Sequence, residues 1–288
     1  MNPVNIGLSV NVKRDRELLV TKKVLACLRK HHMTPVLAKP IAAELGLSEG
    51  YDETTFYEKS EFIVSLGGDG TLLSTARSSY AHDVPVFGIN LGTVGFLAEV
   101  EINDIENAFE RLAQGNYALV ERMVLLAQVH RNGKCVFDSI ALNDVVVSRG
   151  GLSRVIRLKV FVDNQFIDSF PGDGVIVSTP TGSTAYTLSA GGPIVQPDMR
   201  MMITTPICPH ILYSRSFITC PERVINIRIN DDYPDSAILT MDGQEGFEVL
   251  AGDKISIKCM DKGVRFVTIN DINFYDVLRA KIHSRDTE

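Results

Sequence analysis

Three glycines surround an aspartate in the run Gly67–Thr71, directly after the apolar segment Phe62–Leu66. A glycine-rich turn between a strand and a helix can bring backbone N–H groups close to a phosphate. The carboxylate of Asp69 is unusual there, because a plain phosphate cradle avoids negative charge. It indicates chemistry on a hydroxyl group, or a divalent metal ion carried by the phosphates. The run therefore predicts phosphoryl transfer, and a tight turn with Asp69 as a helix cap is the structural alternative.

A second candidate site is the segment Thr179–Tyr186, which is rich in hydroxyl groups around a proline and a glycine. Its small side chains allow a ligand to approach the backbone closely, and hydroxyl and N–H groups can bind phosphate or ribose. We expect a helix to begin near Ser183 and to add the positive end of its dipole. A capped helix N-terminus without a ligand is the alternative.

A third candidate site is the pair Asn143 and Asp144, which interrupts the apolar segment Ile140–Val147. A polar group inside a buried strand costs free energy unless it is hydrogen-bonded. These two side chains therefore indicate either ligand binding or a satisfied β-bulge. Two glycine-adjacent aspartates, in Gly172–Gly174 and Asp242–Gln244, are more typical of hairpin turns, although the last residue of the second turn could point at a ligand.

The composition argues against several classes of protein. The net charge is 29 − 35 = −6 and the sequence pI is about 5.6, which disfavours a nucleic-acid partner and an anionic membrane surface. The five cysteines never form a C-x-x-C pair, so neither a disulfide framework nor a thiolate metal site is indicated. No apolar run reaches the roughly 18 residues that span a bilayer, and no signal-peptide pattern is found. We expect a cytoplasmic protein, and we assign no role to His210.

The first hundred residues alternate strand and helix patterns. Short apolar runs predict strands and amphipathic runs predict helices, with Asp15 as a cap of the first helix. This alternation is typical of an α/β domain with an open, mostly parallel, Rossmann-like sheet. Ligands of such sheets bind beyond the carboxyl ends of the strands, where Gly67–Gly70 and Asn90–Phe96 are expected to lie. The predicted strands are Val4–Val10, Phe62–Leu66 and Pro85–Asn90, and the predicted helices are Arg16–Lys30 and Thr71–Tyr80.

From about Val120 onward, short runs rich in β-branched and aromatic residues replace the helical patterns. They predict a β-rich, sandwich-like second domain. A helix with Asn103 as its N-cap, Glu106 three residues later and Gly115 at its end is expected to join the domains. We place the α/β domain at 1–102 and the β-rich domain at 103–270, and we expect the helical tail, 271–288, to pack back on the first domain.

Five motifs, taken together and in order, closely resemble those of the NAD kinase family, particularly its bacterial members. The resemblance covers nearly the whole chain. The glycine-rich run alone is shared with diacylglycerol and sphingosine kinases, whereas the hydroxyl-rich segment together with Asn143 and Asp144 is much more specific to NAD kinases. The motifs are Gly67–Thr71, Asn90–Phe96, Asn143-Asp144, Gly172–Gly174 and Thr179–Tyr186.

The resemblance implies a transferase that moves the γ-phosphoryl group of ATP to the 2′-hydroxyl of the adenosine ribose of NAD and gives NADP, a step of NADP biosynthesis. It implies that 103–270 is the NAD-binding domain. It also implies a divalent cation, Mg²⁺ or another, that is carried mainly by the ATP phosphates. Members of the family are typically homo-oligomers, often homotetramers built as a dimer of dimers.

The resemblance also implies roles for single residues. Asp69 matches the general base for the ribose hydroxyl. Asn143 and Asp144 match residues that hold ligand hydroxyls or the adenine side. Asp173 matches an acid at the nicotinamide amide end, and Phe96 matches a ring beside the adenine. The other nucleotide-binding positions that carry over are Gly70, Thr184, Ala185, Tyr186 and Ser189, with Arg154 and Gln244 as further ligand contacts.

Two positions depart from the family pattern. Pro171 stands where some bacterial relatives carry an arginine, two residues before the acid at the nicotinamide end, so a charged contact from that position is absent. Thr93 and Val94 stand where relatives often have a larger polar residue and a leucine. The second difference predicts a slightly altered pocket on the adenine side.

Two other functions fit part of the sequence. A lipid kinase would share the glycine-rich run, but no basic or amphipathic membrane-docking stretch is evident. A sensor that binds the dinucleotide without turnover would not need Asp69. If Asp69 is the base, its replacement by Asn is expected to lower turnover by about 10²–10⁴ while NAD still binds.

Overall fold

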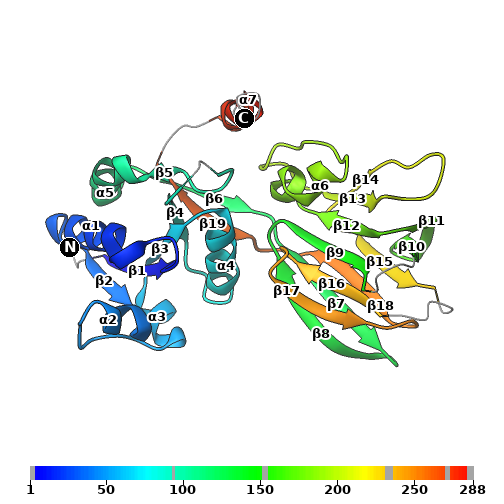
Figure 1. The fold of residues 1–288 in the computed structure, drawn as a ribbon, viewed down its shortest axis with the longest axis horizontal. Coiled ribbons are helices and arrows are strands. Elements are labelled where there is room, and N and C mark those ends of the chain that lie inside the picture. Colours follow the sequence, from blue (N-terminus) through cyan, green and yellow to red (C-terminus); the bar gives the residue numbers. More distant parts are fainter. Residues whose placement is uncertain (1–3, 93–94, 151–154, 231–235, 270–272, 284–288) are drawn as a thin grey trace. The chain divides into compact units, whose positions relative to one another are not determined.

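The computed structural model describes residues 4–92, 95–150, 155–230, 236–269 and 273–283. The chain folds as two compact units (Figure 1). The first unit comprises 1–121 and 264–288, and the second comprises 122–263. The division therefore falls after Glu121 and before Val264, whereas the sequence analysis placed it at 102/103 and 270/271.

The first unit is built on the predicted open sheet. Its described strands lie in the order β2-β1-β3-β4-β19-β6, with β5 beside β4. The pairs that β1 makes with β2 and β3, and those that β4 makes with β3, β5 and β19, are parallel. The strands are β1 Asn5–Val10, β2 Thr34–Leu37, β3 Phe62–Gly67, β4 Val86–Asn90, β5 Val100–Glu101, β6 Ala118–Arg122 and β19 Val264–Thr268.

Helices cover both faces of this sheet because successive side chains of a strand point to opposite faces. Val64 and Leu66 of β3 share a core with α1 and α5, whereas Ile63 packs on the other face with α3. Ser65 shares that second face and hydrogen-bonds Thr75 of α4 (3.2 Å). The helices are α1 Leu19–Lys30, α2 Lys39–Glu44, α3 Glu53–Lys59, α4 Asp69–Tyr80, α5 Ile105–Ala113 and α7 Phe274–His283, with 3₁₀ turns η1 Arg16–Leu18 and η2 Ile102–Asp104.

Asp15 caps the first long helix, as the sequence predicts. It precedes η1, and its buried carboxylate reaches across that turn to the start of α1. It accepts the backbone N–H groups of Val20 (2.9 Å) and Thr21 (2.8 Å) and the Thr21 hydroxyl (2.6 Å). Two of the donors that a helix N-terminus leaves without intrahelical partners are satisfied in this way.

The start of α5 differs from the prediction. The turn η2 runs into the helix, so Asp104 rather than Asn103 stands at the N-cap, and no side-chain capping bond forms there. The apolar face is as expected, because Ile105, Phe109 and Leu112 are buried in the core of the first unit. That burial explains why the helix belongs to the first unit and does not open the second.

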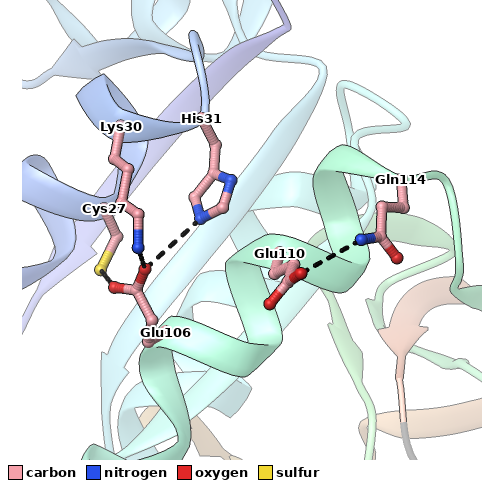
Figure 2. Close-up of polar contacts among 6 residues, drawn as sticks. All are labelled: Cys27, Lys30, His31, Glu106, Glu110 and Gln114. Atoms are coloured by element: carbon pink, nitrogen blue, oxygen red, sulfur yellow. Dashed lines mark hydrogen bonds and ion pairs between the residues drawn. The ribbon is translucent and has the colours of Figure 1, made fainter.

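Glu106, the expected capping partner, instead faces α1 (Figure 2). Cys27 Sγ donates a hydrogen bond to Glu106 Oε2 (3.1 Å), Lys30 forms an ion pair with Oε1, and His31 Nε2 lies 3.7 Å from Oε1. The hydrogen bonds from Lys30 and Cys27 lower the pKa of Glu106 to about 2, whereas burial and the Glu106 contact raise the pKa of Cys27 to about 11. Cys27 is therefore a protonated thiol that packs α1 against α5, and all five cysteines are free.

The second unit is the predicted sandwich of two antiparallel sheets. The strand orders are β11-β10-β15-β18-β7-β8 and β14-β13-β12-β9-β16-β17. Ile225, Ile227 and Ile229 of the first sheet share one core with Val145 and Val147 of the second, as the period-two alternation of apolar residues requires. The strands are β7 Leu125–Arg131, β8 Lys134–Ala141, β9 Asp144–Arg149, β10 Ile156–Val162, β11 Gln165–Gly172, β12 Gly174–Ser178, β13 Met202–Ile207, β14 Phe217–Thr219, β15 Val224–Ile229, β16 Ala237–Met241, β17 Glu245–Val249 and β18 Lys254–Cys259.

The helical segment expected to begin near Ser183 is short. The segment forms a 3₁₀ turn, η3 (Thr181–Thr184), and a single helical turn, α6 (Tyr186–Ser189). One turn aligns few peptide dipoles, so any contribution of a helix dipole to phosphate binding there is small. Among the helices of the described residues, none is long and apolar enough to cross a membrane.

Candidate active site

The candidate residues fall into two sets, one in each unit. In the first unit, adjacent parallel strands end together because Gly67 pairs with Asn90 across β3 and β4. The loop after β1 joins this edge, since the Asn11 N–H donates to the Leu66 carbonyl (3.0 Å) and the Asn11 side-chain amide donates to the Thr71 hydroxyl (2.9 Å). Three loops thus meet where an open α/β sheet binds its ligands.

Asp69 is the first residue of α4, and its half-buried carboxylate reaches the loop after β4. Oδ2 accepts the N–H of Phe96 (2.8 Å), and Oδ1 accepts those of Leu97 (3.2 Å) and Ala98 (3.3 Å). The approach requires a glycine at position 95, because a Cβ on Gly95 would lie 1.8 Å from Oδ1. A carboxylate has about four lone-pair sites; the described residues use three of them and leave one on Oδ2.

The structure therefore does not make Asp69 a simple helix cap. Gly68 occupies the N-cap position, and the carboxylate bonds a different loop rather than its own helix. The neighbouring Gly70 is exposed. Phe96 is half-buried, and Lys281 Nζ of α7 lies 5.8 Å from the centroid of its ring.

Arg14 joins this edge, although the sequence analysis did not single it out. Its Nη1 would lie 2.6 Å from a Cβ on Gly68 and 3.7 Å from one on Gly92, so the guanidinium lies against both glycine loops. Arg14 is exposed, its backbone N–H donates to the Asn11 carbonyl (2.9 Å), and within the described residues no hydrogen bond or ion pair joins its guanidinium. The run of charges Lys13–Arg16, placed just beyond a predicted strand, was the sequence signal that could have identified it.

In the second unit the candidate residues gather where β9 begins and β12 ends. Leu142 and Asn143 carry the chain from β8 in one sheet to β9 in the other, so Asn143 and Asp144 mark a crossing rather than a β-bulge. Thr179 holds this crossing: its N–H donates to the Asn143 carbonyl (2.9 Å) and its hydroxyl to the Leu142 carbonyl (2.6 Å). Gly182 packs so closely against this crossing that a Cβ there would lie 2.0 Å from the backbone carbonyl oxygen of Asn143. Two motifs that are far apart in sequence are thus brought together.

Asp144 is buried, with 4% of its surface exposed. Burial raises its pKa to about 7, the negative charge of Asp242 adds to the rise, and a hydrogen bond from the Tyr186 backbone N–H opposes it. Near neutral pH the side chain therefore exists in both protonated and ionised forms, and it can donate as well as accept a hydrogen bond. An acid perturbed in this way is typical of a functional site.

Asp173 marks a second crossing, from β11 to β12, and not a hairpin turn. Its Oδ1 accepts Arg149 Nε (2.8 Å), and its carbonyl accepts the Arg149 N–H (3.0 Å). Arg149 therefore forms an ion pair with Asp173, and the antiparallel register of β9 and β12 is what brings the two residues together. Asp144 and Arg149 stand at the two ends of β9, roughly 17 Å apart at the usual rise per residue.

The remaining predicted positions have different surroundings. Burial raises the pKa of Tyr186, and the charges of Cys208, Asp173 and Asp144 add to the rise, so its hydroxyl lies within electrostatic reach of both aspartates. Gln244 is exposed in the predicted turn between β16 and β17. Arg154, Thr93 and Val94 lie outside the described residues. Thr184 and Ala185 are half-buried, and Ser189 is exposed.

Comparison with known proteins decides the family. The model of the ATP-NAD kinase N-terminal domain matches residues 16–117, and that of the ATP-NAD kinase C-terminal domain matches residues 142–269. An NAD kinase of Acetivibrio thermocellus is 46% identical over 283 residues, which cover 98% of each chain. The chain belongs to the NAD kinase family. Its activity is the ATP-dependent phosphorylation of NAD. The family assignment therefore favours an NAD kinase over the lipid kinase considered from the sequence.

Other relatives agree with this assignment. An NAD kinase of Thermoanaerobacter pseudethanolicus is 42% identical over 281 residues, covering 97% of this chain and 99% of the relative. The yeast NADH kinase complexed with NADH aligns with a TM-score of 0.87 at 25% identity, over 97% of this chain and 86% of that one. An NAD kinase from Archaeoglobus fulgidus in complex with ATP shares the fold, with a TM-score of 0.76 at 23% identity over 98% and 99% of the two chains.

The raised pKa of Asp144 predicts a pH dependence of stability. Between about pH 4 and about pH 7 the native state keeps a proton on Asp144 that the unfolded state has lost. This group therefore lowers the free energy of unfolding as pH rises through that window. Asp144→Asn removes the titration, so the variant should gain stability relative to the wild type, by up to a few kcal/mol, as pH rises. Urea denaturation at several pH values across the window measures the difference.

Asp163→Asn is the matched control for this measurement. Hydrogen bonds from the Val224 backbone N–H and from Arg223 hold the pKa of Asp163 below its ordinary value, so it titrates below the window. The stability of this variant should run parallel to that of the wild type. Parallel curves for Asp144→Asn as well would contradict the raised pKa.

Proposed function

We propose that the enzyme transfers the γ-phosphoryl group of ATP to the 2′-hydroxyl of the adenosine ribose of NAD, giving NADP, with Asp69 as the general base. The observation that carries this proposal is the setting of the Asp69 carboxylate. It lies at the carboxyl edge of the parallel sheet, it is held by three backbone N–H groups, and the described residues leave one lone pair on Oδ2. A base needs both a fixed direction and an open acceptor site.

The chemistry suits a carboxylate held in this way. A ribose hydroxyl is a poor acid, so a carboxylate within hydrogen-bond reach helps as the proton leaves, and such help gives about 10²–10⁴ in rate. The hydroxyl proton passes to Oδ2 while the ribose oxygen forms its bond to the γ-phosphorus and the bond to the ADP leaving group breaks. Most of the remaining acceleration should come from alignment of the reacting groups and neutralisation of phosphate charge.

The proposed cation is Mg²⁺, or another divalent ion, carried mainly by the ATP phosphates. Mg²⁺ usually keeps several water ligands and binds through substrate phosphates with one or two carboxylates. Within the described ranges, no group of three or more His, Cys, Asp or Glu side chains is arranged to hold a metal ion. An ion carried by the phosphates would neutralise charge on the group that is transferred.

Arg14 extends the proposal to the phosphates of ATP. A guanidinium forms forked, charge-assisted hydrogen bonds with phosphate oxygens. The contacts of Arg14 with the loops of Gly68 and Gly92 place such a group beside the edge that carries Asp69. Bound phosphate would provide the partner that the described residues do not.

The dinucleotide side of the proposal rests on the second unit. Asn143 and Asp144 would hold ligand hydroxyls or the adenine side, and Asp173 would hold the nicotinamide amide end. The separation of roughly 17 Å along β9 suits an extended ligand such as a dinucleotide. The other proposed contacts are Thr184, Ala185, Tyr186, Ser189, Gln244 and Arg154, with Gly70 and Phe96 from the first unit.

The proposal also covers the oligomeric state of the protein and its location in the cell. A homotetramer arranged as a dimer of dimers, and a place in the cytoplasm, are supported by the resemblance of the motifs to the family. Neither bears on the roles of single residues proposed above.

Asp69→Asn tests the base directly. The amide keeps one oxygen acceptor but cannot take the proton, so kcat should fall by about 10²–10⁴ while the Kd for NAD changes little. NADP formation from ATP, Mg²⁺ and NAD, coupled to an NADP-specific dehydrogenase, gives kcat, and calorimetry gives Kd. Normal turnover would remove Asp69 from the base role.

Gly95→Ala separates the base from the support of the loop. The added carbon would lie 1.8 Å from Asp69 Oδ1, so the loop Phe96–Ala98 must move while the carboxylate remains. This variant should raise the KM for NAD more than it lowers kcat, whereas Asp69→Asn should lower kcat more than it raises the KM for NAD. If both variants lose kcat and affinity in the same proportion, Asp69 serves only to hold the loop.

Arg14→Ala tests the phosphate contact. Loss of a hydrogen bond to a charged group should raise the KM for ATP roughly tenfold or more, with little change in the Kd for NAD. Arg16→Ala removes the same charge from an exposed residue two positions away and is the matched control. An equal effect of the two substitutions on the KM for ATP would mean that only net charge matters.

A further inference from the structure

Asp242 makes an unusual set of contacts for a turn residue. Its Oδ1 accepts the backbone N–H groups of Asn143 (2.7 Å) and Asp144 (3.1 Å), and its Oδ2 accepts that of Leu142 (3.0 Å). Its own N–H donates to the Asp144 carbonyl (2.9 Å). One residue of the β16–β17 turn therefore fixes three consecutive peptide groups of the β8–β9 crossing.

The crossing is held from the opposite side as well. Thr179 binds the carbonyls of Leu142 and Asn143, whereas Asp242 binds the N–H groups. A backbone fixed at both its donors and its acceptors sets the directions in which the Asn143 and Asp144 side chains leave it. Unpaired N–H groups at this half-buried position would cost free energy, so the backbone would otherwise rearrange.

We propose that Asp242 is a positioning residue for the dinucleotide: its carboxylate fixes the backbone of Leu142–Asp144 so that the side chains of Asn143 and Asp144 meet the ligand in one orientation. The inference rests on the proposed binding roles of those two residues. Asp242 itself needs no contact with substrate for this role.

A second effect of Asp242 is electrostatic. Its negative charge adds to burial in keeping Asp144 protonated up to about neutral pH. Tyr186 of α6 also lies near Asp144: its backbone N–H donates a hydrogen bond that opposes the rise in the pKa of Asp144, and the charge of Asp144 adds to the rise in the pKa of Tyr186. Asp242 thus fixes the position of Asp144 and widens the pH range in which that side chain can donate a hydrogen bond.

The test compares Asp242→Asn with a matched turn aspartate. Asp242 (φ 52°) has a left-handed backbone, which asparagine also tolerates, and the amide removes the charge and one of the two acceptor oxygens. Asp163 (φ 53°) occupies the turn between β10 and β11 and likewise accepts a backbone N–H, that of Val224 (3.0 Å). Asp163→Asn therefore removes a similar contact in the same unit, away from Asn143 and Asp144.

Calorimetric Kd values for NAD, measured on the full chain from pH 6 to pH 8, give the readout. Asp242→Asn should weaken NAD binding roughly tenfold or more, and the midpoint of the pH dependence should move to lower pH because a like charge near Asp144 is gone. Asp163→Asn should leave both the Kd and the midpoint unchanged. If Asp242→Asn does not fold, Asp242→Ser, which keeps one oxygen acceptor without the charge, is measured in its place.

Two results would overturn the inference. One is a folded Asp242 variant with the wild-type Kd and the wild-type pH midpoint. The other is an equal loss in the Asp163 control, which would mean a general effect on stability. Failure of the proposed binding roles would look different, because Asn143→Ala and Asp144→Asn would then leave the Kd for NAD unchanged.

Discussion

Backbone N–H groups at the ends of strands and helices need acceptors, and in this fold aspartate carboxylates supply them. Asp69 accepts three N–H groups of the loop after β4, and Asp242 accepts three of the crossing before β9. Asp15 does the same for the start of α1. A carboxylate can satisfy several donors at once, so a single side chain fixes a loop that has no regular hydrogen-bond ladder of its own.

This constraint connects folding with function. Loops that are already fixed lose little freedom when substrate binds, and that lowers the cost of binding and aligns the reacting groups. The arrangement also has a cost, because burial raises the pKa of Asp144 and the negative charge of Asp242 adds to that rise. The same arrangement leaves an acid that titrates near neutral pH where a dinucleotide is proposed to bind. The raised pKa of Asp144 therefore lowers the free energy of unfolding near neutral pH and also provides the acid of the proposed binding site.

The sequence predicted the features that depend on local patterns. Short apolar runs predicted the parallel strands, which are buried on both faces. Alternation of apolar and polar residues predicted the sandwich, whose strands are buried on one face. Arg149 and Asp242 depend instead on strand register and on turns that approach from far away in sequence, so no local pattern revealed their partners. The segment around Ser183 forms a 3₁₀ turn and one helical turn, because a hydroxyl-rich sequence with a glycine also suits a tight turn. Asn103 is not the N-cap because it lies inside the 3₁₀ turn η2, which precedes α5.

Hydrogen exchange in the ligand-free protein tests the central claim most directly. If carboxylates fix these loops before substrate arrives, the amides of Phe96–Ala98 and Leu142–Asp144 should exchange at least about a hundredfold more slowly than free peptide amides, as for an opening free energy of about 3 kcal/mol. The highly exposed Leu212 and Tyr213, in a loop of the second unit, provide the fast reference. Exchange of the two aspartate-bound loops as fast as this reference would show that the carboxylates do not hold them, and would contradict the account.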